Sequence, residues 1–222
     1  MEKRVLISID PRETRLAVLE GGELVQLRIE RDAVEVGSIY KGRIERVLPG
    51  MDSCFVDIGL DRNAFMHVSD FIEAEEAAKQ ADEKTKRRRR PRAGKPSREF
   101  MPPITDVAHE GEEILVQVAR APLGSKGARG TTRISLPGHH VVLLPVGSDH
   151  VGVSRKIESD SVRGRLKEWS KEIKPRGYGM IVRTEAAGCT KEDLEADVER
   201  LRKTWRRIKD AYRKKAAPAL LH

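Results

Sequence analysis

Short stretches in which apolar and polar residues alternate dominate the first third of the chain, and this alternation predicts β-strands. Three such runs lie at 5–9, 14–19 and 23–29, separated by Asp10-Pro11 and by Gly21-Gly22. Turn residues between β-rich runs predict a three-stranded meander. Because three strands are too few to stand alone, we expect this sheet to pack on another part of the protein.

The stretch 37–71 predicts three more strands, and its alternation leaves two aromatic rings off the apolar face. In one strand the apolar positions 54, 56 and 58 share a face, so Phe55 points to the other side. In the next, positions 64, 66 and 68 face inward and turn Phe65 outward. With Lys41, Arg43 and Arg62 nearby, we interpret the rings as a platform on which bases stack. The alternative is that both rings pack under a loop or a neighbouring domain.

The second half of the chain predicts a further group of strands. A β segment is expected over 131–136, continued over 139–144, with Gly138 between the two parts. Shorter strands are expected at 151–155 and 178–182.

Two helices are predicted in the same half. Val162, Leu166 and Trp169 recur at helical spacing behind N-cap candidates at 159–161. In the last helix, Thr190 and Asp193 have the spacing of a capping box. An apolar stripe follows that box, formed by Leu194, Val198, Leu201, Trp205, Ile208 and Tyr212. Trp205 is expected in the core.

The chain's last residues predict the start of a strand. Pro218 ends the helix, and Ala219 to His222 follow it. We interpret this strand as the complement of the N-terminal meander, with the intervening segments inserted between the two.

One segment departs from the globular pattern. Residues 81–99 form a run of basic charge with Pro and Gly and few apolar side chains, which predicts a disordered insertion. Two interpretations stand side by side. The insertion is either a non-specific electrostatic tether for RNA or a solvated loop.

The chain's charge narrows the choice of partner. Its 43 Lys and Arg outnumber its 35 Asp and Glu, giving a net charge of +8. Together with the aromatic pair, that surplus indicates a nucleic acid rather than a membrane. No segment has the length of a membrane span or the pattern of a signal peptide, so we expect a cytoplasmic location. Cys54 and Cys189 stand alone without a CxxC motif, which predicts reduced thiols and no structural zinc in these residues.

Two places in the sequence are candidates for chemistry, the Arg183-Thr184 pair and Asp10. A strand-terminal Arg183 can grip a phosphate with two bonds, the Thr184 hydroxyl can add a third, and the backbone at Gly138 can approach an anion closely. By itself an Arg-Thr pair also fits a surface ion pair. Asp10 at the end of the first strand is either a metal-binding carboxylate or a turn cap before Pro11.

Several motifs resemble known proteins. The residues Tyr40-Lys41-Gly42, 53–59 and 65–69, with 111–118 as a closing strand, resemble the S1-type RNA-binding domain, a five-stranded OB-fold barrel. A longer series resembles the N-terminal portion of the bacterial ribonuclease E/G family. That series comprises KGRIERVLPGMDSCFVDIG, GSKGARGTTRISLPGHHVVLLP, VGVSRKIES, GYGMIVRTEAAG and APALLH.

The resemblance to the ribonuclease E/G family implies an α+β, mostly β fold in three parts. Residues 1–36 would begin an RNase H-like subdomain without nuclease function, and 37–128 would form the S1-type domain with the insertion at about 81–99. Residues 129–222 would form a small α/β 5′-sensor domain.

The resemblance also implies the binding residues. The pocket for a 5′-monophosphate would comprise Gly138, Val142, Arg155, Arg183 and Thr184. Arg183 would make a bidentate contact and Thr184 a hydroxyl contact, Gly138 and Val142 would border the terminal nucleotide, and Arg155 would support them. Phe55, Phe65 and Lys126 would line the RNA path.

The family's catalytic aspartates, which hold Mg²⁺, and its zinc-sharing cysteine motif have no match in this chain. The resemblance therefore implies the RNA-binding, end-sensing part of an endoribonuclease of RNA decay and of rRNA and tRNA processing. We expect this part to be inactive alone, to bind single-stranded RNA with a 5′-monophosphate, and to belong to a full-length homo-oligomer.

Two alternatives remain open. One is an enzyme active as it stands, with Asp10, Asp52, Asp57 or Asp61 holding metal. The other is an S1-type protein that binds RNA without reading its end.

Overall fold

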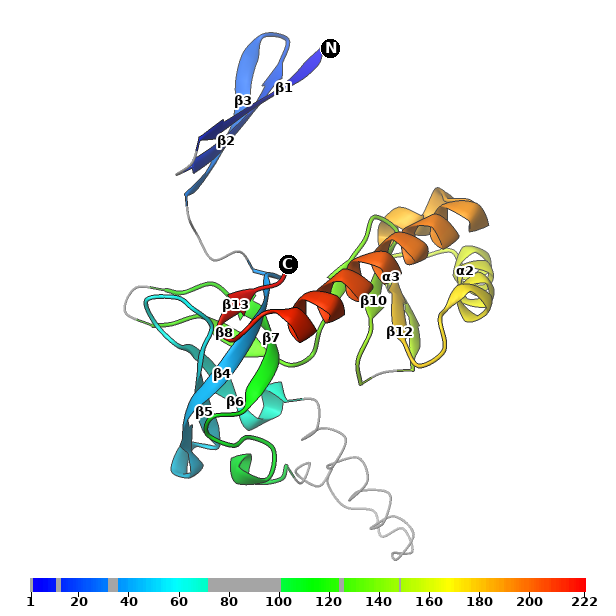
Figure 1. Ribbon diagram of the computed structural model, residues 1–222. Helices are drawn as coiled ribbons and strands as arrows, with labels where there is room; N and C mark the ends of the chain where they lie inside the picture. Colours follow the sequence, from blue (N-terminus) through cyan, green and yellow to red (C-terminus); the bar gives the residue numbers. More distant parts are fainter. Residues whose placement is uncertain (1, 11–12, 32–35, 72–100, 124–125, 148) are drawn as a thin grey trace, which may run out of the picture. The chain divides into compact units, whose positions relative to one another are not determined.

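The computed structural model describes residues 2–10, 13–31, 36–71, 101–123, 126–147 and 149–222 (Figure 1). The chain divides into two compact units, Met1–Glu35 and Val36–His222. The described residues are mostly β-strand with two α-helices, which agrees with the expected α+β class. The basic insertion predicted at 81–99 lies outside the described residues. Neither described helix has the length and apolarity to cross a bilayer.

The first unit is an antiparallel meander. It comprises β1 (Lys3–Asp10), β2 (Glu13–Glu20) and β3 (Glu23–Arg31) in the order β1-β2-β3, which confirms the predicted arrangement. Gly21 and Gly22 both have positive φ angles, 61° and 93°, as a two-residue hairpin turn requires. Apolar side chains on the sheet stay exposed, among them Ile7 and Ile9.

The second unit begins with a closed barrel. Its strands are β4 (Ile39–Leu48), β5 (Ser53–Asp57), β6 (Ala64–His67), β7 (Glu113–Arg120) and β8 (Arg129–Thr131). The sheet order is β4-β5-β6-β8-β7, and pairing of β4 with β7 closes it. This confirms the three strands predicted over 37–71 and the closing strand predicted at 111–118. The apolar positions 54, 56, 58, 64, 66 and 68 are all buried.

Four short 3-10 turns lie in connections between the described strands and helices. They are η1 (Pro49–Met51), η2 (Val68–Asp70), η3 (Ile104–Asp106) and η4 (Thr184–Gly188).

A second sheet follows the barrel. It comprises β9 (Leu136–Pro137), β10 (Val141–Leu144), β11 (Val151–Val153) and β12 (Gly179–Val182) in the order β11-β12-β10-β9. Helices α2 (Asp160–Ile173) and α3 (Lys191–Lys214) pack with it around one core, which includes Leu143, Leu166, Met180 and Leu201. Ile39 of β4 belongs to the same core, so the barrel and the second sheet share buried contacts.

The predicted β segment over 131–136 is wrong in extent. Strand β8 ends at Thr131 and joins the barrel, whereas β9 starts the second sheet at Leu136. Side chains take the place of a strand ladder between them. The Thr131 hydroxyl donates to the carbonyl oxygen of Asp70 at 2.8 Å, and the Gln117 amide bonds both the N–H and the carbonyl oxygen of Ser135.

Both helices begin as predicted. The Ser159 hydroxyl accepts the N–H of Val162, and Thr190 forms a reciprocal capping box with Asp193. Trp205 is 6% exposed, which confirms its place in the core. The far end of α3 meets the barrel, where the Tyr212 hydroxyl donates to the carbonyl oxygen of Glu113 at 2.8 Å.

The last strand, β13 (Ala219–Leu220), pairs antiparallel with β4 of the barrel, and its interpretation as a complement of the meander stays a prediction. Strand β5 pairs with β4 only from Arg43 onward. The backbone groups of β4 before that point are therefore open to another strand. Ile39 N–H donates to the carbonyl oxygen of His222 at 2.9 Å, and Leu221 N–H donates to that of Ile39 at 2.8 Å.

Candidate nucleic-acid interface

The two aromatic rings of the barrel form a pair. Phe55 in β5 and Phe65 in β6 are direct cross-strand partners, with ring centroids 6.0 Å apart in an edge-to-face arrangement. Both are half-buried rather than fully exposed, because each ring covers part of the other. The Phe65 N–H donates to the carbonyl oxygen of Ala128 at 2.8 Å, which ties the loop containing the exposed Lys126 to the same strand. The three residues thus occupy neighbouring segments of the barrel.

Arg183 follows β12 and contacts the turn between β9 and β10. Its Nη1 donates to the carbonyl oxygen of Gly138 at 2.5 Å, and its N–H donates to that of His140 at 2.8 Å. Val142 in β10 pairs with Ile181 in β12, two residues before Arg183. The structure therefore brings Gly138, Val142 and Arg183 to adjacent strands and their connecting turn. Arg183 Nε also lies 3.3 Å from the exposed carboxylate of Glu185.

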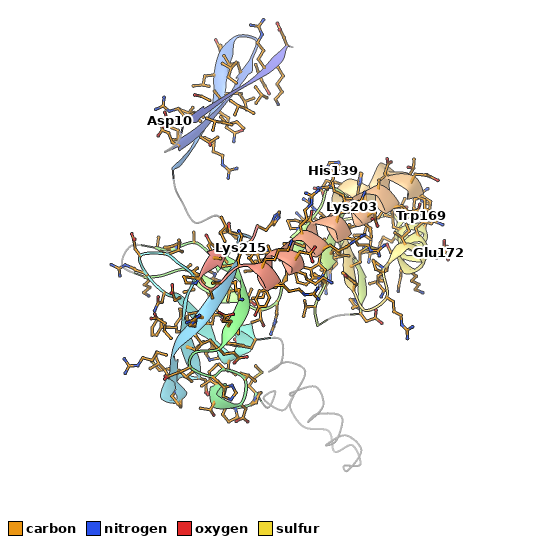
Figure 2. The ribbon with its side chains drawn as sticks, in the orientation of Figure 1. Asp10, His139, Trp169, Glu172, Lys203 and Lys215 are labelled. Atoms are coloured by element: carbon orange, nitrogen blue, oxygen red, sulfur yellow. The ribbon has the colours of Figure 1, made fainter. Side chains whose placement is uncertain are left out.

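Asp197 of α3 holds this turn, and the sequence reasoning missed it. One carboxylate oxygen accepts the N–H of His140 at 2.9 Å and of Val141 at 3.2 Å, and the other is paired with Arg200. Figure 2 shows His139, from the same turn, beside α3. A Cβ at Gly138 would collide with both carboxylate oxygens, so only glycine permits this approach.

The environment of Asp197 keeps it charged. Burial raises the pKa of its carboxyl, but the hydrogen bonds from the turn and from Arg200 outweigh that effect and hold the pKa below its ordinary value. A signal for this residue did exist in the sequence. Asp197 stands in the stripe of Leu194, Val198 and Leu201, where a carboxylate needs buried donors.

Thr184 and Arg155 are connected through Ser154. The Thr184 and Ser154 hydroxyl oxygens lie 2.9 Å apart, and the Ser154 N–H donates to the carbonyl oxygen of Val182 at 2.8 Å. Arg155 is exposed and lines a groove of about 530 Å³ between β11 and α2. Gly138, Val142, Arg183 and Thr184 do not line that groove.

The candidate metal-binding aspartates lie in different segments of the chain, with Asp61 in the connection between β5 and β6. Asp10 ends β1 of the meander (Figure 2), and Asp52 follows η1 with a φ of 45°. Asp57 accepts the N–H of Gly59 at 2.8 Å, as a turn residue does. The described residues contain no group of three or more His, Cys, Asp or Glu side chains that could hold a metal ion.

A small barrel with paired rings, followed in the same unit by a second sheet with exposed basic side chains, is an arrangement suited to polyanions such as nucleic acids. The comparisons with known proteins agree with that class of partner. Residues 135–222 match the model of the ribonuclease E/G family. Ribonuclease G of Salmonella typhimurium is 42% identical over 211 residues, which is 94% of this chain and 40% of that protein. Ribonuclease E of a Nostoc species is 37% identical over 223 residues, 100% of this chain and 29% of that protein.

The chain belongs to the ribonuclease E/G family. It spans about two fifths of the length of the ribonuclease G relatives that it matches, including that of Escherichia coli at 41% identity.

Proposed function

We propose that this chain is the RNA-binding and 5′-monophosphate-sensing part of an endoribonuclease that cuts single-stranded RNA in RNA decay and in rRNA and tRNA processing. The barrel would be its S1-type OB-fold domain, residues 129–222 its 5′-sensor, and residues 1–36 the start of an RNase H-like subdomain. Support comes from the family and above all from one contact, the bond from Arg183 to Gly138.

That bond prepares the Arg183 guanidinium for a phosphate. A guanidinium has five N–H donors in a fixed plane, and Gly138 uses one of them. The bond fixes the orientation of the plane, so less side-chain entropy is lost when a phosphate binds the remaining donors. The ion pair with Glu185 is exposed on both sides and therefore weak enough for a phosphate to displace.

Discrimination between RNA ends follows from the same geometry. A 5′-hydroxyl would leave the Arg183 charge without an anion, and a 5′-triphosphate would crowd a site bordered by the Gly138 turn. The Thr184 hydroxyl would contribute a further hydrogen bond, and Val142 would border the terminal nucleotide. Phe55 and Phe65 would stack on bases farther along, near Lys126.

The test compares two RNA oligonucleotides of identical sequence, one with a 5′-monophosphate and one with a 5′-hydroxyl. Fluorescence anisotropy should give tighter binding of the phosphorylated RNA, and Arg183→Ala should abolish the difference. Arg207→Ala removes an exposed Arg of α3 and serves as the matched control, which should keep the preference. Equal affinity of the unmodified chain for both ends would overturn end sensing and favour RNA binding alone.

A second measurement addresses hydrolysis. The proposal expects the purified chain to leave a 5′-monophosphorylated RNA intact in the presence of Mg²⁺. Reproducible cleavage that Asp10→Ala abolishes would instead establish an enzyme active as it stands.

A further inference from the structure

A groove on the second sheet contains Arg155 of the expected 5′-phosphate pocket and two further basic side chains, Arg163 and Lys167, that this pocket does not include. It has a volume of about 530 Å³ and lies between the edge strand β11 and helix α2. Its lining consists of His150, Val151, Gly152, Val153, Arg155, Arg163, Gly164 and Lys167. We call it the α2–β11 groove. Its volume is within the range of about 300–1,000 Å³ that is usual for ligand sites.

Three basic side chains line the α2–β11 groove. Arg163 and Lys167 lie four residues apart and so share a face of α2, while Arg155 approaches from the loop after β11. Arg163 Nη1 donates to the carbonyl oxygen of Ser154 at 2.7 Å and to that of Ile157 at 3.3 Å, which holds its charge in place. Among the described residues, Arg155 and Lys167 form no ion pair with a carboxylate.

Both walls of the groove contain a glycine. A Cβ at Gly164 would meet open space, and a Cβ at Gly152 would meet nothing closer than 3.8 Å. Glycine is unfavourable inside a helix, so packing gives no reason for Gly164. Its effect is to leave the helix backbone open to the groove, with room for a bulky anion.

The groove adjoins the proposed 5′-phosphate pocket. The Ser154 hydroxyl bonds Thr184 of that pocket, and Arg155, the next residue, lines the groove. A polyanion whose end lies at Arg183 would therefore pass the basic side chains of the groove a short way farther on.

We propose that the α2–β11 groove binds the phosphodiester backbone of single-stranded RNA at nucleotides that follow the 5′ end. This inference rests on the proposed function, because it takes the RNA to be held at Arg183. Binding would be independent of sequence, since Arg155, Arg163 and Lys167 would contact phosphates. The groove would thus add affinity without adding selectivity for the chemistry of the 5′ end.

The salt dependence of binding sets the size of the effect. Each phosphate of a single strand that a basic side chain neutralises makes the slope of log affinity against log salt concentration steeper by about 0.7. Near 0.1 M salt this corresponds to roughly fivefold in affinity for each contact. Two contacts in the groove should therefore contribute on the order of 25-fold.

Substitution of Gly164 can change the charge of the groove without a steric clash. Gly164→Glu places a carboxylate in the groove where the Cβ has open space, and Gly164→Gln is the matched neutral control. Gly164→Glu should weaken binding of a longer RNA roughly 5- to 25-fold and lower its salt slope by about 1 relative to Gly164→Gln. A 5′-monophosphorylated dinucleotide, too short to enter the groove, should bind both variants equally. Equal affinity of the two variants for the longer RNA would overturn the proposal.

The same series separates this inference from end sensing. Gly164→Glu should weaken 5′-phosphate and 5′-hydroxyl RNA by the same factor, whereas Arg183→Ala should remove only the difference between them. If Gly164→Glu weakens RNA binding but the unmodified chain shows no preference for a 5′-monophosphate, RNA binding in the groove is supported and end sensing is refuted. Lys167→Gln, an exposed change, should lower the salt slope in the same way, and an unchanged slope would count against the groove.

Discussion

Replacement of Asp197 tests how α3 holds the turn that carries Gly138. Asp197 is a buried carboxylate whose side chain is 4% exposed, and it accepts the N–H groups of His140 and Val141. Asp197→Ala removes the acceptor and leaves two N–H groups without a partner. Asp197→Asn keeps one side-chain oxygen that can accept both N–H groups, but this oxygen carries no negative charge.

The expected cost follows from those two bonds. A buried donor left without an acceptor costs about 1–3 kcal/mol, so loss of the acceptor for two donors in Asp197→Ala should lower the free energy of unfolding by about 2–6 kcal/mol. Bonds to a charged acceptor are worth about 1.5–3 kcal/mol and neutral ones about 0.5–1.5 kcal/mol. Asp197→Asn should therefore cost less, about 1–3 kcal/mol over the two bonds.

A double-mutant cycle with Gly138→Ala provides the assay. Gly138→Ala alone should destabilise by about 1–3 kcal/mol, because its Cβ would collide with the Asp197 carboxylate. Asp197→Ala opens that space, so the double variant should lose less than the sum in urea unfolding. Strict additivity, or an Asp197→Ala variant as stable as the unmodified chain, would refute the reasoning.

The pH dependence gives the same test another form. The folded pKa of Asp197 lies below its unfolded value of about 3.9, so its stabilising contribution is complete above that value. The contribution is lost as pH falls through the folded pKa. Asp197→Asn should therefore lose less stability than the unmodified chain between pH 5 and pH 2 in acid unfolding followed by circular dichroism.

Three further outcomes are expected. Phe55→Ala and Phe65→Ala should each weaken RNA binding by about 1–3 kcal/mol with an unchanged circular dichroism spectrum, and loss of folding would show that the rings are core residues. Because the rings touch, the double variant should lose less than the sum. Glu185→Gln should raise affinity for 5′-monophosphorylated RNA by up to about fivefold, since it removes a competing ion pair, and should not do so for 5′-hydroxyl RNA. Burial, reinforced by the charge of Asp70, raises the pKa of Cys54 to about 12. Alkylation at pH 8 should therefore label Cys54 far more slowly than Cys189, as measured by mass spectrometry. Equal labelling rates in the folded chain would contradict the burial of Cys54.

Local patterns in the sequence determined much of the fold. Alternation placed the strands of the meander and of the barrel, because side chains of a strand point to opposite faces whatever lies around it. The capping box at Thr190 and the stripe through Trp205 fixed the start and the buried face of α3, since both depend on neighbours within a few residues. Alternation also predicted that Phe55 and Phe65 share a face of the barrel. The order of the sequence motifs along the chain indicated the ribonuclease E/G family.

Features that join distant segments were decided only by the tertiary structure. The pairing of β13 with β4 depends on where β5 stops, about 160 residues earlier, and no local pattern at Ala219 records that. The place of Asp197 in the apolar stripe indicates a buried carboxylate, but only the folded turn at Gly138 supplies the N–H groups that it accepts. The α2–β11 groove likewise exists only where Gly152 of a strand faces Gly164 of a helix. Periodicity specifies which side of an element is buried, but the partner on that side is selected by packing across the whole chain.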